Sequence, residues 1–250
     1  MKIDINADIG EGFVNDKNLF SLISSCNIAC GGHVGDYKSI KESIKLAINH
    51  NVKIGAHPSF PDKLNFGRKK IKISSNDLEK SLISQINLVI KIAKDHNKRI
   101  HHIKPHWALY NLAFYDFKTC EIIVNCIKKI PYKVILFSQY KSLLSSLASE
   151  NGINIYNEVF IDREYNDDLS LVSRENKNAI TNDQNIINKK ILNIIKKKKI
   201  TSINNVKMDV KADTYCIHGD NPNALIIIKS LISFLNYHKI RLKWKQENLS

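Results

Sequence analysis

The chain has 250 residues, 43% of them hydrophobic, which is enough for one large α/β domain over residues 1–250 with a sizeable core. No apolar run reaches the roughly 18 residues that a membrane span needs, and the N-terminus lacks the apolar region of a signal peptide, so we expect a cytoplasmic protein with no membrane partner. The formal net charge of +14 comes without an aromatic-interleaved basic stripe, so we favour a solvated basic surface over nucleic-acid binding, although the charge could attract small acidic substrates.

The first twelve residues are typical of a strand that leads into a reactive turn. Apolar and polar side chains alternate up to position 8, and Gly10 and Gly12 then allow a sharp exit. The carboxylates of Asp8 and Glu11 are therefore expected just beyond the strand's C-terminal end. We expect Asp16 to cap the short helix that follows.

The next two predicted strands also lead into reactive residues. A strand near residues 25–30 runs into Gly31-Gly32-His33, where the glycines indicate a tight turn or a close approach of the backbone to a ligand. Asp36 then opens a helix through about residue 51. A strand over residues 52–56 delivers His57.

A long loop over residues 58–74 follows, and loops of this length within compact domains are usually functional. The loop could close over a pocket as a lid that brings Arg68 toward an anionic group. A surface excursion with Arg68 in water is the alternative. A second long loop is predicted over residues 162–174.

The rest of the chain continues to alternate between helix and strand. We predict a helix opened by Ser75 or Asn76, a strand at 99–103, a helix ending near 130, strands at 133–137 and 153–159 around a helix at 139–151, a helix from Asp183 to 199, strands within 203–210 and at 214–217, a helix at 223–238 and a terminal strand at 240–244. This alternation predicts a mainly parallel sheet, and seven or eight units favour a TIM-like barrel over an open sheet. A dinucleotide site and a self-contained P-loop ATPase are disfavoured because their glycine motifs are absent.

Imidazoles, carboxylates and a lysine follow several of these strands, which places them on one rim of a barrel. Packing alone gives no reason for such side chains to gather at so many strand exits, so we predict a functional site there. The catalytic candidates are Asp8, Glu11, His33, Asp36, His57, Lys104, His106, His218 and Asp220.

Two kinds of chemistry fit these candidates. Asp8, His33 and His57 could hold a divalent metal with an open position. Alternatively, a carboxylate and an imidazole act as general base and acid while Lys104 and the glycine-loop amides stabilise an oxyanion. His33 and Asp36 could also be a simple orienting pair, and the spacing does not decide among these possibilities.

The five cysteines are scattered and lack Cys-x-x-Cys spacing, which indicates neither a disulfide framework nor a zinc finger. Cys30 lies beside the glycines and His33, so a nucleophilic thiol is one interpretation. We favour a buried thiol that acts as a small hydrophobe.

Taken in order, the motifs resemble the LamB/YcsF family, whose members are the A subunits of 5-oxoprolinase. Seven stretches spread over nearly the whole chain carry the resemblance. They are residues 4–12, 27–36, 54–62, 65–68, Lys104-Pro105-His106 with 108–111, 158–165 and Cys216-Ile217-His218-Gly219-Asp220.

The resemblance implies an irregular (β/α) TIM-like barrel of the glycoside hydrolase/deacetylase type. It implies ATP-dependent opening of 5-oxo-L-proline (pyroglutamate) to L-glutamate, with ATP as the co-substrate of a complex that includes subunits B and C. The missing nucleotide loop agrees with a division of labour in which a partner activates the lactam and this chain hydrolyses it. Within the motif stretches, our candidates for substrate binding are Asn6, Gly31, Gly32, Arg68, Asp162 and Arg163.

The chain departs from the family pattern at two places. Trp107 stands where the family usually has glycine after Lys-Pro-His, and we expect its ring to narrow the pocket or displace the backbone. The loop over 167–174 lacks a glycine and a proline of the family's motif, which puts its turn geometry in question. The alternative functions are a stand-alone metal-dependent deacetylase or amidohydrolase and a non-catalytic ligand-binding subunit.

Overall fold

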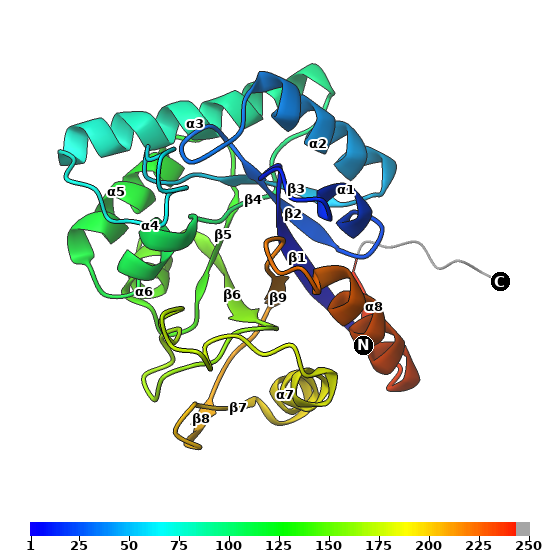
Figure 1. Ribbon diagram of the computed structural model, residues 1–250. Coiled ribbons are helices and arrows are strands. Elements are labelled where there is room, and N and C mark those ends of the chain that lie inside the picture. Colours follow the sequence, from blue (N-terminus) through cyan, green and yellow to red (C-terminus); the bar gives the residue numbers. More distant parts are fainter. Residues whose placement is uncertain (244–250) are drawn as a thin grey trace.

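Within residues 1–243, which the computed structural model describes, seven parallel strands close into a barrel (Figure 1). Closure is achieved because β1 pairs on one side with β2, Asn6 opposite Ser25, and on the other with β9, Asp4 opposite Thr214. The barrel strands are β1 (Lys2–Ile9), β2 (Ser25–Ala29), β3 (Lys53–His57), β4 (His102–Ile103), β5 (Ile135–Gln139), β6 (Asn154–Phe160) and β9 (Thr214–Ile217). The predicted TIM-like barrel is confirmed.

The interior of the barrel is polar. Asp4 accepts hydrogen bonds from the hydroxyls of Ser25 and Thr214. Asn6 donates to the Thr214 hydroxyl and accepts from Asn27, whose side chain in turn contacts His102. The alternation in β1 therefore places its apolar side chains against the helices and its polar side chains inside the barrel, where each finds a partner.

Helices cover the outside of the barrel (Figure 1). In α3, the apolar residues Leu82, Ile86 and Val89 recur on one face and are buried, as the helical period of 3.6 requires. The helices are α1 (Asp16–Leu19), α2 (Tyr37–Asn49), α3 (Ser75–Asp95), α4 (Trp107–Leu112), α5 (Phe117–Lys128), α6 (Leu143–Glu150), α7 (Gln184–Lys197) and α8 (Ala224–Tyr237). None of the helices in the described residues is both long and apolar enough to cross a membrane.

Capping side chains explain where two of the helix predictions were wrong. The single helix expected before residue 130 is two helices, because Asp116 accepts the backbone N–H of Thr119 and starts α5 afresh. The N-cap of α3 is Ser74, which accepts the N–H of Asp77, and not Ser75 or Asn76.

Asp16 does not cap α1, because the N-cap position is Asn15. Its carboxylate instead accepts hydrogen bonds from the backbone N–H groups of Gly10, Glu11 and Gly12, at 3.0, 3.0 and 3.2 Å. Asp16 thereby fixes the turn that carries Glu11.

Two short strand pairs lie beside the barrel. The strand predicted within 203–210 is one half of an antiparallel pair, β7 (Lys199–Thr201) with β8 (Lys207–Asp209). The predicted terminal strand is the short β10 (Arg241–Leu242), which pairs with the beginning of β1. Trp244, the last residue of that prediction, lies outside the described residues.

Candidate active site

Seven of the nine catalytic candidates lie together at the carboxyl-terminal mouth of the barrel. They come from β1 and the turn after it, from the turn after β2, from the end of β3, and from the segments that follow β4 and β9. Each is buried, with 8% or less of its surface exposed: Asp8, Glu11, His33, His57, Lys104, His106 and His218. The carboxyl ends of barrel strands are where TIM-like enzymes hold their reactive groups.

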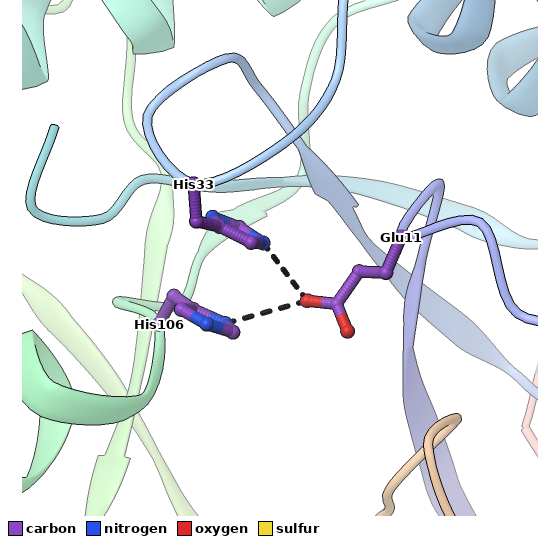
Figure 2. Close-up of side chains that lie close together, drawn as sticks. All are labelled: Glu11, His33 and His106. Carbon is purple, nitrogen blue, oxygen red and sulfur yellow. Dashed lines mark hydrogen bonds and ion pairs between the residues drawn. The ribbon is translucent and has the colours of Figure 1, made fainter. Parts of the chain in front are cut away.

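Glu11 is the meeting point of the histidines (Figure 2). Its Oε1 lies 3.0 Å from His33 Nε2, 3.3 Å from His106 Nδ1 and 3.8 Å from His57 Nε2. The rings of His33 and His106 are stacked, with centroids 3.7 Å apart and planes inclined by 3°. Glu11, His33 and His106 form a group that could hold a metal ion.

The hydrogen-bond network assigns the tautomer of each histidine. His57 Nδ1 and His106 Nε2 face the backbone carbonyls of Lys104 and Phe66, at 2.7 and 3.0 Å, and a carbonyl only accepts. Both nitrogens therefore carry hydrogen.

The same reasoning applies to His33. Its Nδ1 lies 3.0 Å from the hydroxyl of Ser59, which already donates its hydrogen to the carbonyl of Phe60. Ser59 can then only accept, so His33 Nδ1 carries the hydrogen. All three imidazoles, in their neutral form, turn a lone pair toward Glu11.

This arrangement suits a divalent cation. Burial and the neighbouring His57 lower the pKa of His33 to about 3, and burial with His57 and His33 lowers the pKa of His106 well below its usual value. Both rings are thus neutral near pH 7, the form that binds metal. Burial and the charge of Asp8 raise the pKa of the Glu11 carboxyl, and one proton on Glu11 could satisfy only one of the facing lone pairs. Fixed outer hydrogen bonds on each histidine are typical of metal-binding sites.

The trio that we predicted for a metal, Asp8, His33 and His57, shares only His33 with this group. Asp8 turns toward a different centre: its Oδ1 accepts hydrogen bonds from Lys104 Nζ at 2.9 Å and from Asn27 at 2.8 Å. It lies 3.5 Å from His57 Nε2.

Lys104 is the hub of this second centre. Besides Asp8, its Nζ contacts Glu158 Oε1 at 3.1 Å and Cys216 Sγ at 3.0 Å, inside the barrel. Burial opposes the charge on Lys104, but Asp8 and Cys216 raise its pKa well above the usual value. Burial likewise opposes ionisation of Asp8, yet His57 and Lys104 lower its pKa. Both groups are therefore charged near neutral pH.

His218 joins this region through Asp162, whose Oδ1 is 2.9 Å from His218 Nδ1. Asn221 donates to the other oxygen of Asp162 at 3.2 Å. Although burial opposes its ionisation, the ion pair with His218 holds the pKa of Asp162 at about 2. Both carboxylate oxygens of Asp162 therefore have protein partners, and Asp162 orients His218.

Several other candidates lie apart from the cluster. Asp36 is exposed and its carboxylate caps α2 by accepting the N–H of Ser39. Arg163 is buried and donates to the carbonyls of Val172 and Ala179, which holds the second long loop in place. Asn6 lies inside the barrel among polar partners.

The glycines, Arg68 and Asp220 also have defined places. Gly31 has φ +100° at a tight turn, and Gly32 packs so closely on Ser59 and Gln85 that a Cβ there would overlap them. Arg68 and Asp220 pair with each other at 3.0 Å above the cluster. Neither touches the histidines in the described contacts.

Sequence reasoning missed Glu158, which contacts Lys104, and Ser59, which contacts His33. Glu158 lies on β6 opposite Thr214 of β9, and its place within a stretch that resembles the family was the available signal. Ser59 also lies in such a stretch, residues 54–62, so the same signal was available. Cys30 is a buried thiol whose pKa burial raises, in agreement with the interpretation that we favoured.

A small chamber lies between Lys104, His57, His218 and Trp107. Its volume is about 20 Å³, which suits one water molecule, since a water needs at least about 10–15 Å³. A ring-sized ligand requires the mouth to open.

Fold and site together define a parallel β/α barrel protein with a buried histidine and carboxylate cluster at its mouth. A GH18 chitinase from Pseudoalteromonas aurantia shares this fold, with a TM-score of 0.51 at 11% identity over 94% of this chain and all of the other. The LamB/YcsF family model matches residues 3–249, and the chain belongs to that family.

Two relatives support the family membership. A protein of Campylobacter jejuni that is named as the A subunit of 5-oxoprolinase is 37% identical over 246 residues, covering 96% of each chain. The crystal structure of a lactam utilization protein from Thermus thermophilus is similar with a TM-score of 0.89, at 30% identity over 97% of this chain and 99% of the other.

Proposed function

We propose that this chain is the A subunit of a 5-oxoprolinase that opens 5-oxo-L-proline to L-glutamate while ATP is hydrolysed to ADP and phosphate. The name of the Campylobacter jejuni relative supports the activity, and the word subunit in that name supports assembly with further chains. We assign ATP use to the assembly with subunits B and C because no glycine-rich nucleotide loop occurs in the sequence. This chain then hydrolyses the lactam after a partner has activated it.

The observation that carries the proposal is the chamber beside Lys104. Lys104 and His57 both line it, and its volume of about 20 Å³ fits one water molecule. A charged ammonium in a dry site stabilises the negative charge that develops on a carbonyl oxygen during attack. Hydrolysis of an amide ring needs this charge stabilisation together with a base for the water.

His57 is our candidate for the base. Its Nδ1 hydrogen bond to the Lys104 carbonyl fixes the tautomer, so in the neutral ring Nε2 carries the lone pair that takes a proton from water. Nε2 lies 3.0 Å from His106 Nδ1, so the water has to reach it beside that ring. Asp8, 3.5 Å from Nε2, stabilises the imidazolium that results. Activation by a partner places the terminal phosphoryl group of ATP on the lactam oxygen. The water oxygen then bonds to the ring carbon, the carbon–nitrogen bond breaks, and the proton on His57 passes to the departing nitrogen. A second water releases phosphate from the acyl phosphate that results, which leaves the carboxylate of L-glutamate.

Glu11, His33 and His106 are our candidates for binding a divalent cation. When bound, such an ion would polarise a carbonyl oxygen or lower the pKa of a water. The neutral rings of His33 and His106 and the outer hydrogen bonds described above fit this role.

The test is glutamate release from 5-oxo-L-proline and ATP, measured with this chain alone and with its B and C partners. We expect release only with the partners, and loss of activity in the assembly for His57→Ala and Asp8→Asn. Arg99→Gln is the control, because Arg99 is exposed and precedes β4 at the opposite end of the barrel. Unchanged activity of both site variants would exclude the catalytic roles and favour a ligand-binding role.

The metal group favours a second candidate, a deacetylase or amidohydrolase that acts without partners. This function predicts stoichiometric divalent metal and amide hydrolysis by the chain alone without ATP. Full activity of the chain after chelation would exclude it.

A further inference from the structure

Two arginines stack on the Trp107 ring, which lines the chamber. The guanidinium carbons of Arg68 and Arg174 lie 4.4 and 3.8 Å from the centre of the Trp107 ring. Both arginines donate to Oδ2 of Asp220, at 3.0 and 2.8 Å. We call these four residues the clasp. They follow β3, β4, β6 and β9, so the clasp ties four sides of the barrel mouth together.

The backbone of the clasp is strained at Trp107, where φ is +28°. Positive φ favours glycine, and a bulky residue persists there only where its surroundings hold it. The two arginine contacts hold the ring in place. Glycine would form this turn without strain, so a tryptophan at this position indicates that its ring has a role.

Trp107 lines two neighbouring cavities. The inner chamber of about 20 Å³ and an outer pocket of about 600 Å³ share Trp107, Asn111, Arg163 and Leu171 as lining residues. The outer pocket falls within the roughly 300–1,000 Å³ of small-molecule sites. A ligand that enters the outer pocket therefore meets the clasp before it can reach Lys104 and His57.

Two polar atoms that line the outer pocket are buried without a hydrogen-bond partner. Gln139, only 3% exposed, has an unpartnered Oε1 acceptor, and Arg174 has an unpartnered Nε donor. Buried polar atoms in native proteins are nearly always paired. A ligand with an N–H donor and an anionic acceptor would satisfy both.

We propose that Arg68 and Arg174 form the binding site for the carboxylate of a small lactam acid, and that Asp220 occupies this site as an internal carboxylate until the ligand displaces it. Displacement releases Arg68 and Arg174 from Asp220, the Trp107 ring moves with them, and the outer pocket joins the chamber. With Asp220 in place, the reacting groups stay shielded from bulk water. The identity of the ligand as 5-oxo-L-proline rests on the proposed function; the anion site rests on the clasp.

The ion pairs of the clasp suit such an exchange. The side chain of Arg68 is 41% exposed and that of Arg174 is 22% exposed, so both can be reached from the outer pocket. Partly exposed ion pairs are weak enough to be exchanged for a ligand carboxylate of the same geometry. Arginine offers paired N–H donors that match a carboxylate, which a lysine does not.

The experiment is calorimetric titration of the full chain with 5-oxo-L-proline and with 2-pyrrolidinone, the same lactam ring without the carboxylate. We expect Arg174→Gln to weaken binding of 5-oxo-L-proline at least about tenfold, the effect of losing a charge-assisted hydrogen bond, and to leave binding of 2-pyrrolidinone unchanged. Asp220→Asn should tighten binding of 5-oxo-L-proline about three- to tenfold, because the competing carboxylate is removed. Arg99→Gln is the matched loss of one arginine charge away from the site.

Trp107 gives an independent readout of movement. The chain has two tryptophans, so in the Trp244→Phe variant the tryptophan fluorescence comes from Trp107 alone. We expect 5-oxo-L-proline, but not 2-pyrrolidinone, to change this fluorescence along the same binding curve.

Several results would overturn the proposal. These are no saturable binding of 5-oxo-L-proline by the wild-type chain, equal weakening of both lactams by Arg174→Gln, or weaker binding in Asp220→Asn at an unchanged melting temperature. None of these measurements uses ATP or partner subunits. Binding that depends on the carboxylate, without glutamate release, would therefore contradict the proposed function and support the anion site at the clasp. Glutamate release, with binding that does not depend on the carboxylate, would contradict only the anion site.

Discussion

His57 Nε2 lies 3.0 Å from His106 Nδ1, and the opposite nitrogen of each ring donates to a backbone carbonyl. In their neutral forms, two imidazoles held in this way would face each other with lone pairs. Repulsion between them is relieved only if a proton or a cation lies between the rings. The two backbone carbonyls thus orient both rings so that their other nitrogens form a site for a proton or a cation.

Substitution of Ser59 tests whether backbone and side-chain hydrogen bonds orient the histidines for a cation. Ser59→Ala removes the acceptor that fixes the tautomer of His33, and we expect divalent metal to bind about 10–100-fold more weakly, as for other outer hydrogen bonds of metal sites. Zinc titration by calorimetry measures the effect. Ser146→Ala is a matched control on α6, outside the metal-binding group. An unchanged zinc affinity for Ser59→Ala would contradict the tautomer assignment.

Asp16 is expected to act on the same site through the turn that it holds. In Asp16→Ala the N–H groups of Gly10, Glu11 and Gly12 lose their shared acceptor, so Glu11 loses its fixed position. We predict faster hydrogen exchange at these amides together with about tenfold weaker zinc binding. Asp16→Asn keeps an oxygen acceptor, so its amide exchange rates and zinc affinity should lie between those of the wild type and Asp16→Ala. Slow exchange in Asp16→Ala would show that the turn holds itself.

Lys104 should dominate the stability of the barrel interior. Lys104→Met leaves Asp8 and Glu158 buried without their cation, and breaking a buried ion pair in this way costs about 3–5 kcal/mol of the free energy of unfolding. Urea unfolding followed by circular dichroism measures the loss. Adding Glu158→Gln removes one stranded charge, so the double variant should be more stable than Lys104→Met alone. Equal stability of the two would mean that Glu158 is neutral in the native protein.

The Asp162 and His218 pair predicts a defined dependence of stability on pH. With a native pKa of about 2 against about 3.9 when unfolded, Asp162 contributes about 2–3 kcal/mol that is fully present above the unfolded value and is lost as the pH falls through the native one. The stability difference between wild type and Asp162→Asn should therefore shrink as the pH falls from about 4 to about 2. Chemical unfolding at several pH values checks this. A difference that stays constant over this range would contradict the pairing.

The fold was largely predictable because local patterns repeat along the chain. The alternation in β1, the helical stripe in α3 and the caps at Asp36 and Asp183 are each written within a few neighbouring residues. Asp116 shows the limit: an acidic residue in the middle of a helical pattern gave no sign that it would cap a new helix. Which face of β1 meets the helices also depends on closure of the barrel, not on the alternation itself.

The candidate site was predictable as a set of residues but not as a set of partners. Strand exits place histidines and carboxylates on one rim, whereas the reach and rotamer of each side chain decide which of them meet. Asp8 is taken up by Lys104, so Glu11 replaces it beside His33. The clasp joins Arg68 to Asp220 across 152 positions of sequence, a contact that exists only once the barrel has closed.

The hydrogen-bonded interior of the barrel has a consequence for how this protein can change. In a hydrophobic core one apolar side chain can replace another of similar size with a small loss of stability. Here each polar side chain instead hydrogen-bonds a neighbour on an adjoining strand, as Asp4, Asn6, Asn27 and Thr214 do. An apolar replacement at one position leaves a buried group on the next strand without a partner. A substitution inside this barrel is therefore tolerated only together with a compensating substitution on the neighbouring strand. The amino-acid sequence of the barrel interior should consequently vary far less than that of the helices outside.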